Sequence, residues 1–173
     1  DNEITVLGEG LEIVNRRTST NTTDGTHFGS LHILGEDDEH TFFVRNEASS
    51  NKALSLQSVE ITGADASHFS TSGAPKPGQA PIAVAPGVSF PFTVTFDPAS
   101  TGLKTATVRI LNDDSNETPY TFNVSGNGIS GPNLRVRGSQ DPNVLPYSDI
   151  NNGSTIPMAT NGRMATRMIK PIA

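Results

Sequence analysis

The chain has 173 residues, 34% of them hydrophobic and only 6% aromatic, with 12 Lys/Arg against 18 Asp/Glu and no cysteine. The lack of cysteine excludes disulfides and thiolate metal sites, and no segment has the apolar length of a membrane-spanning helix. The 16 glycines and 12 prolines, together with plentiful Thr, Ser, Val and Asn, predict an all-β fold with many turns.

Charge is distributed unevenly along the chain. Residues 1–130 carry seven Lys/Arg and sixteen Asp/Glu, a net charge of −9, whereas residues 131–173 carry five Lys/Arg and two Asp, a net charge of +3. The acidic body argues against nucleic-acid binding. An acidic body with a basic tail suits head-to-tail association, although the charge of the tail can also serve solubility alone.

The first predicted strand recurs near the other end of the chain. Residues 4–10 read Ile-Thr-Val-Leu-Gly-Glu-Gly, and residues 122–128 read Phe-Asn-Val-Ser-Gly-Asn-Gly. This match predicts one repeat of about 120 residues, flanked by parts of neighbouring units. On this reading residues 1–10 are an orphan strand copied from the last strand of the domain, acting as a linker or as a donor to another sheet.

Residues 11–128 show the pattern of an immunoglobulin-like antiparallel β-sandwich. We expect strands near 11–15, 27–34, 53–62 and 80–85, and clear period-two alternation predicts strands at 41–45, 89–96, 105–110 and 120–125. Each alternating strand has one apolar face, as two packed sheets require. The predicted core is Phe42, Val44, Phe90, Phe92, Val94, Phe96, Val108, Ile110, Phe122 and Val124.

Two residues in these strands need separate explanations. Pro91 implies a sheet edge, or a position whose N–H side faces no partner. Phe43 lies between two core residues and therefore points outward. An exposed aromatic marks a contact surface, or else a loop or the tail covers it.

Residues 129–173 are predicted to be an extended, basic, Gly/Asn/Pro-rich tail. It is either the start of a next repeat or an inter-subunit segment. If the termini act between subunits, the inter-subunit candidates are Ile4, Val6, Phe43, Met158, Met164, Met168 and Ile169.

No catalytic motif is present, and no cofactor is expected. The four histidines, His27, His32, His40 and His68, are dispersed without ligand spacing. The acidic run Glu36–Glu39 is expected to be a solvated turn. The weak calcium candidates are Asp113, Asp114 and Glu117, for which the alternative is a hairpin loop at 112–116 stabilised by Asx turns.

Four motifs resemble one family. They are residues 23–29 (Thr-Asp-Gly-Thr-His-Phe-Gly), residues 61–66 followed by Phe69, Phe96-Asp97-Pro98 with Gly102, and residues 112–122. Together they resemble, over about residues 1–162, the repeat of bacterial "choice-of-anchor D" surface proteins, which are related to Hydin-like and ASH immunoglobulin-like domains. After Gly162 the chain departs from that pattern and reads Arg163-Met164-Ala165-Thr166-Arg167, which favours a special C-terminal segment.

The resemblance implies an extracellular or cell-surface sandwich, bacterial in type and usually arranged in tandem, with no catalytic residues. Our first hypothesis is a non-catalytic structural subunit or repeat of a filament or array, associating head to tail by β-strand addition. Its partners would be its own copies or neighbouring repeats, without nucleic acid and without a membrane span. The alternative is an adhesin or carbohydrate-binding surface module.

Overall fold

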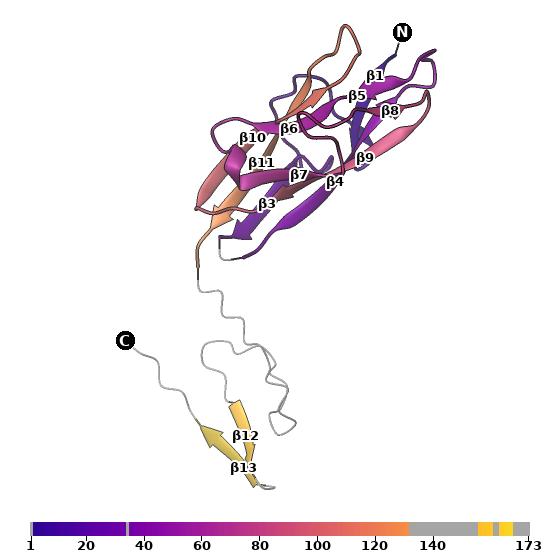
Figure 1. The fold of residues 1–173 in the computed structure, drawn as a ribbon. Helices are drawn as coiled ribbons and strands as arrows, with labels where there is room; N and C mark the ends of the chain where they lie inside the picture. Colours follow the sequence, from indigo (N-terminus) through magenta and orange to yellow (C-terminus); the bar gives the residue numbers. More distant parts are fainter. Residues whose placement is uncertain (1, 34, 132–155, 161–162, 168–173) are drawn as a thin grey trace. The chain divides into compact units, whose positions relative to one another are not determined.

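The computed structural model describes residues 2–33 and 35–131, together with the backbone of residues 156–160 and 163–167 (Figure 1). The chain divides into two compact units, Asp1–Pro132 and Asn133–Ala173. The strands of the first unit are β1 (Ile4–Gly8), β2 (Leu11–Glu12), β3 (His27–His32), β4 (Asp38–Asn46), β5 (Leu54–Leu56), β6 (Ser58–Thr62), β7 (Phe69–Ser72), β8 (Ile82–Val84), β9 (Ser89–Phe96), β10 (Gly102–Leu111) and β11 (Tyr120–Ile129).

The first unit is an immunoglobulin-like β-sandwich, as predicted. One sheet has the strand order β2-β1-β4-β9-β7, and the other has the order β3-β11-β10-β6. Strands β5 and β8 form a small separate pair. Among the described residues, the helical content is one 3₁₀ turn, η1 (Ala66–His68), and no helix is long and apolar enough to cross a membrane.

One strand pair departs from the antiparallel expectation, because β3 runs parallel to β11. After β2 the chain crosses from one sheet to the other and follows the edge of β11, where Asn123 N–H donates to the carbonyl of Arg17 over 2.9 Å. A crossing segment that continues along this edge enters β3 in the same direction as β11. It also explains why the strand expected at 11–15 shrinks to two residues.

The core lies between the inner faces of the two sheets. Nine of the ten predicted core residues are buried, all except Phe90. Phe90 is only partly buried, because β7 pairs with β9 from Thr93 to Phe96 and does not reach it. No β7 residue pairs with Pro91 either. This agrees with the prediction that proline, which has no N–H, lies where that side of the strand has no partner.

The prediction of an orphan strand in residues 1–10 is wrong. β1 pairs with β4 of its own sheet from Ile4 opposite Asn46 to Gly8 opposite Phe42. Ile4 is 2% exposed and Val6 is fully buried, so neither is available between subunits.

The sequence match between β1 and β11 has a packing explanation. The two strands lie in opposite sheets, yet each turns two apolar residues and then a glycine inward. A Cβ at Gly8 would collide with the carbonyl oxygen of Asp24, and one at Gly126 would collide with the ring of Phe96. The shared pattern therefore reflects the same packing demand on two facing strands.

The second unit is described only through a pair of strands, β12 (Ile156–Thr160) and β13 (Arg163–Arg167), which are antiparallel with Met158 opposite Ala165. Met168 and Ile169 lie outside the described residues. Met158 and Met164 are placed only by their backbone, so their inter-subunit role stays a prediction.

Replacing Phe122 by Ala should lower the free energy of unfolding by about 3–5 kcal/mol, because it leaves a cavity in the core. The Phe122 side chain is 1% exposed, and its ring centroid lies 5.5 Å from that of Phe42. Urea denaturation measures the change. Leu103→Ala, at a site 65% exposed on β10, is the matched control and should change stability by less than about 0.5 kcal/mol.

Candidate functional site

The chain enters and leaves the sandwich at opposite ends. At one end, which we call the N-terminal pole, Ile4 N–H donates to Asp114 in the loop between β10 and β11 over 3.1 Å. At the other end, the C-terminal pole, Ile129 of β11 accepts from Ile33 N–H over 3.1 Å. The ten-residue β11 joins the two poles, which at about 3.3 Å per residue separates them by about 30 Å. Figure 1 shows the N-terminus and the exit after β11 at these opposite ends.

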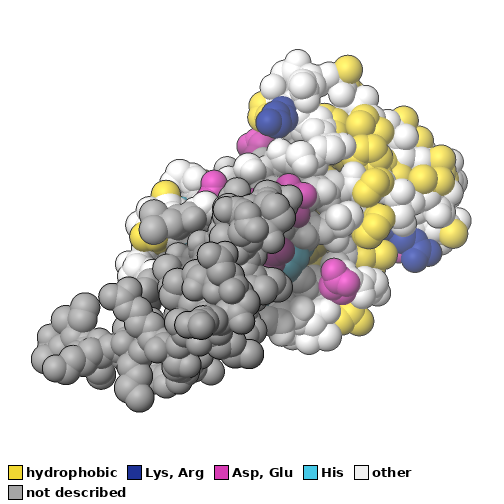
Figure 2. Space-filling model, turned by 90° about the horizontal axis from the view of Figure 1, so that it is seen from below, with side chains coloured by type: hydrophobic (Ala, Val, Ile, Leu, Met, Phe, Trp, Pro, Cys, Tyr) yellow, Lys and Arg dark blue, Asp and Glu magenta, His cyan; other side chains and the backbone are white. Residues whose placement is uncertain are grey.

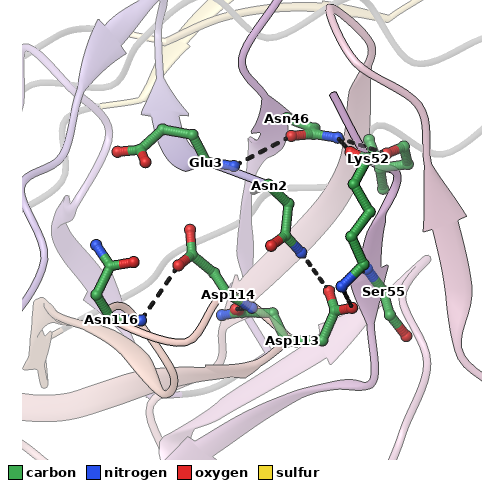
Figure 3. Close-up of polar contacts among 10 residues, drawn as sticks. Asn2, Glu3, Asn46, Lys52, Ser55, Asp113, Asp114 and Asn116 are labelled. Carbon is green, nitrogen blue, oxygen red and sulfur yellow. Dashed lines mark hydrogen bonds and ion pairs between the residues drawn. The ribbon is translucent and has the colours of Figure 1, made fainter. Parts of the chain in front are cut away.

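A polar cluster closes the N-terminal pole (Figure 3). Asp113 accepts three hydrogen bonds, from the Asn2 side chain at 2.5 Å, from Ser55 N–H at 2.7 Å and from Lys52 Nζ at 3.0 Å. These donors come from the segment before β1, from β5 and from the loop before β5. A single carboxylate therefore ties three segments together.

Asp114 holds the start of β1 itself. It is 1% exposed, and it accepts from Ile4 N–H with one oxygen and from Asn116 N–H with the other, at 3.3 Å. Its own N–H donates to the Asn112 side chain over 2.8 Å. The loop is therefore built from Asx turns, which was the structural alternative to a calcium site.

The residue before Ile4 is also fixed. Glu3 N–H donates to Ser50 Oγ over 2.9 Å, with Asn46 Oδ1 at 3.4 Å. Asn46 is fully buried, and its amide donates to the carbonyls of Lys52 and Val84. Side-chain acceptors thus satisfy the backbone N–H of Glu3, just before the first residue of β1 that pairs with β4.

The carboxylates of the pole have opposite pKa shifts. Burial alone would raise the pKa of Asp113, but the hydrogen bonds from Ser55, Lys52 and Asn2 outweigh it and lower that pKa. Burial raises the pKa of Glu117, and the nearby charges of Glu3 and Asp114 raise it further. The pole is therefore acidic, with one carboxylate that is unfavourable in its ionised form.

The arrangement does not favour the calcium hypothesis. Calcium takes carboxylate and carbonyl oxygens as ligands, but the oxygens of Asp113 and Asp114 are occupied by N–H donors. In residues 2–33 and 35–131, no group of three or more His, Asp and Glu side chains could hold a metal ion.

The turn at residues 23–29 is built around a partly buried ion pair. Asp24, 4% exposed, lies 2.7 Å from Arg17 and accepts both the N–H and the hydroxyl of Thr26. Burial would raise the pKa of Asp24, but Arg17 and Thr26 lower it. Ser125 N–H donates to the carbonyl of Thr26 over 2.9 Å, so the pair holds the crossing segment against β11.

The histidines have separate hydrogen-bond partners. His27 hydrogen-bonds Ser125 Oγ at 2.8 Å, and His68 accepts from Ala99 N–H at 3.0 Å. His32 lies on β3, at the edge of its sheet. The acidic run Glu36–Glu39 is only partly a turn, because β4 begins at Asp38.

Of the inter-subunit candidates, only Phe43 lies on the surface of the described part of the chain, at 36% exposure. Sequence reasoning named Asp113 and Asp114, as weak calcium candidates or, in the alternative, as parts of a hairpin loop with Asx turns. It missed Asn2, Asn46, Ser50, Lys52 and Ser55. These residues contact partners 43 to 111 positions away, and no local pattern signals such contacts.

No protein-family model matches the chain, and no curated protein is similar to it in sequence. Among solved structures, a protein of unknown function from Porphyromonas gingivalis is 17% identical with a TM-score of 0.48, and the match covers 73% of this chain and 46% of that one. This chain therefore spans less than half of that protein.

Two further solved structures are similar to nearly their full length. The ASH/PapD-like domain 7 of human CEP192 is 14% identical with a TM-score of 0.40, covering 74% of this chain and 86% of that one. The N-terminal domain of PorA is 12% identical with a TM-score of 0.40, covering 73% and 97%. All three TM-scores are below 0.5 and carry no argument about activity or partners, so the resemblance to choice-of-anchor D repeats stays a prediction.

Replacing Asp114 by Ala should lower the free energy of unfolding by about 1–3 kcal/mol, because a buried N–H is left without its acceptor. Urea denaturation and hydrogen exchange at the Ile4 amide measure the loss. Asp37→Ala, on the exposed loop before β4, is the control. An unchanged Ile4 exchange rate in Asp114→Ala would contradict the anchoring role.

Glu117→Gln should raise the melting temperature at pH 7. The pKa of Glu117 is raised in the folded state, so its contribution is fully present below the ordinary pKa of about 4.3 and is lost as pH rises through the folded pKa. The difference between variant and wild type should therefore vanish in acid. Asp113→Asn is the opposite case: the folded pKa is lowered, so its stabilisation is present at pH 7 and is lost as pH falls. Calorimetry from pH 3 to 8 measures both.

Proposed function

We propose that this protein is a non-catalytic structural unit of an extracellular or cell-surface assembly, either a filament or a tandem array, in which copies join head to tail. The observation that carries the proposal is that the chain enters the sandwich at one pole and leaves it at the opposite pole. Units connected in this way follow one another in one direction, because the chain that leaves one unit leads on to the next.

The described polar clusters support a structural role. Asp113, Asp114 and Asn46 hold the first strand in place, and Asp24 with Arg17 holds the crossing segment. Their polar atoms are used by neighbouring backbone and side-chain groups, not directed at a common point where a substrate could react. The residues around the start of β1 are hydrogen-bonded to several other segments. A mechanical force on the N-terminus is therefore transmitted to the whole sandwich.

The association uses residues 131–173. The donor strand first expected in residues 1–10 is occupied within its own sheet, so that segment is not available to a partner. The remaining segment carries a net charge of +3 against −9 on residues 1–130. Opposite charges steer the segment of one copy to the body of another and disfavour contacts between two bodies.

The full-length chain should show concentration-dependent association in sedimentation velocity, and negative-stain microscopy should show linear chains. Association should weaken as salt rises, because screening removes the charge component. A variant lacking residues 133–173 should be monomeric, with its thermal unfolding confirming an intact sandwich. A full-length chain that stays monomeric at every concentration and salt level would contradict the proposal and favour the adhesin or carbohydrate-binding module.

A further inference from the structure

We propose that the outer face of the five-stranded sheet is a docking surface for the β12–β13 hairpin of a second copy. The surface is centred on a row across four strands, Glu12, Leu7, Phe43 and Pro91, which we call the Phe43 row. The inference rests on the proposed head-to-tail assembly and names the surface that it uses.

The register places the row in a line. Glu12 of β2 is opposite Leu7 of β1, Leu7 is opposite Phe43 of β4, and Phe43 is opposite Pro91 of β9. With neighbouring strands about 4.8 Å apart, the row extends about 14 Å. Leu7 is half-buried and Pro91 exposed. Phe43, at 36% exposure, is the one aromatic among the large hydrophobic residues exposed in the described part of the chain.

The surroundings of the row are small or acidic. Thr41 of β4 is opposite Thr93 of β9, and their short side chains leave the face open beside the ring. Glu39 lies further along β4, where it accepts from Thr95 Oγ1 at 3.3 Å. The nearby cation, Arg45, already lies 3.5 Å from Glu47. The row is therefore an apolar stripe with Glu12 and Glu39 available to a basic partner. Figure 2 shows hydrophobic side chains gathered at the right of the sandwich, with few charged side chains among them.

Three of the four edges of the two main sheets are less suited to a partner strand than this face. On β3, Glu36 accepts from His32 N–H at 3.0 Å. On β6, Val59 N–H already donates to the carbonyl of Pro75 over 2.9 Å, and β2 has only two residues. Capped and short edges are the usual devices against strand addition.

The hairpin has the complementary chemistry. β13 reads Arg-Met-Ala-Thr-Arg and β12 reads Ile-Pro-Met-Ala-Thr, so the pair has an apolar centre, two arginines and no acidic residue. A two-stranded hairpin alone is marginal in water, and packing on a sheet supplies the missing apolar contact.

The connecting chain is long enough to reach a neighbour. Residues 132–155 separate the end of the described sandwich from β12, and 24 residues can extend up to about 80 Å, against about 30 Å between the poles. The occupant can therefore belong to the next copy along a chain.

Photo-crosslinking in the full-length chain tests the contact. Benzoylphenylalanine is placed at position 43, and isotope-labelled and unlabelled chains are mixed, crosslinked and analysed by mass spectrometry. The expected product joins position 43 of one copy to residues 156–167 of another. Crosslinks only within one copy, or from position 43 to the same face of another copy, would overturn the proposed occupant.

Charge exchange gives an independent readout. Arg163→Glu with Arg167→Glu, and Glu12→Lys with Glu39→Lys, should each raise the dissociation constant of the full-length chain at least tenfold, and combining all four should restore it to within about threefold. Phe43→Thr should also weaken association about tenfold, whereas Leu103→Thr on the other sheet should not. If all four changes together bind no better than either pair alone, the proposed contact is wrong.

The outcomes separate this inference from the proposed function. A full-length chain that never associates contradicts both. A chain that associates but crosslinks position 43 elsewhere, or is unaffected by Phe43→Thr, contradicts only the docking surface.

Discussion

The pairing of β1 with β4 is the constraint on which the rest of the arrangement depends. It places the first strand between β2 and β4 in one sheet, where Val6 is fully buried, and so fixes the start of the chain at one pole. The outer edge of β1 is then completed by parts that sequence order keeps apart, namely Ile13 N–H, which donates to the carbonyl of Val6, and Asp114, which accepts from Ile4 N–H. Moving β1 to another subunit would leave the core open, Ile13 N–H without its acceptor and Asp114 without its donor. The first strand therefore belongs to its own unit and is not a segment that passes to another copy.

Much of the sandwich could be predicted because alternation reports directly on one-sided burial. The strands around Phe42, Phe92, Val108 and Phe122 all show apolar residues at every second position, and these residues are buried except for Phe90. The same signal does not say which sheet a strand joins. β1 and β11 share a pattern of two apolar residues and an inward glycine because each packs closely within its own unit, Gly8 against Asp24 and Gly126 against Phe96. The similarity between β1 and β11 suggested that β1 could pair with the sheet of another copy, but it reflects similar packing of the two strands within one unit.

The candidate site was predictable only in part. Asx-rich loops and calcium loops both use acidic residues on a turn, so spacing alone could not separate them. What decides is the set of donors that arrive from elsewhere: Asn2, Lys52 and Ser55 at Asp113, and Ile4 at Asp114. The prediction that Phe90 is buried was wrong for a related reason. Its burial depends on the length of β7, and the sequence of β7 alternates too little to predict that strand. The outward direction of Phe43 could be derived because it follows from its neighbours alone.

An exposed apolar row on a sheet face carries a risk of pairing with itself. Two copies meeting through the same face would form a closed two-fold dimer and stop there. Glu12 and Glu39 oppose this outcome, because face-to-face contact would bring like charges together beneath two strongly acidic bodies. A basic hairpin on a separate segment meets the same face without that repulsion. The contact then joins two different surfaces, and such a contact continues from copy to copy instead of closing. In the proposed assembly, the acidic excess of the body thus gives specificity: it leaves the tail of a neighbour as the favourable partner, and the product is an open chain.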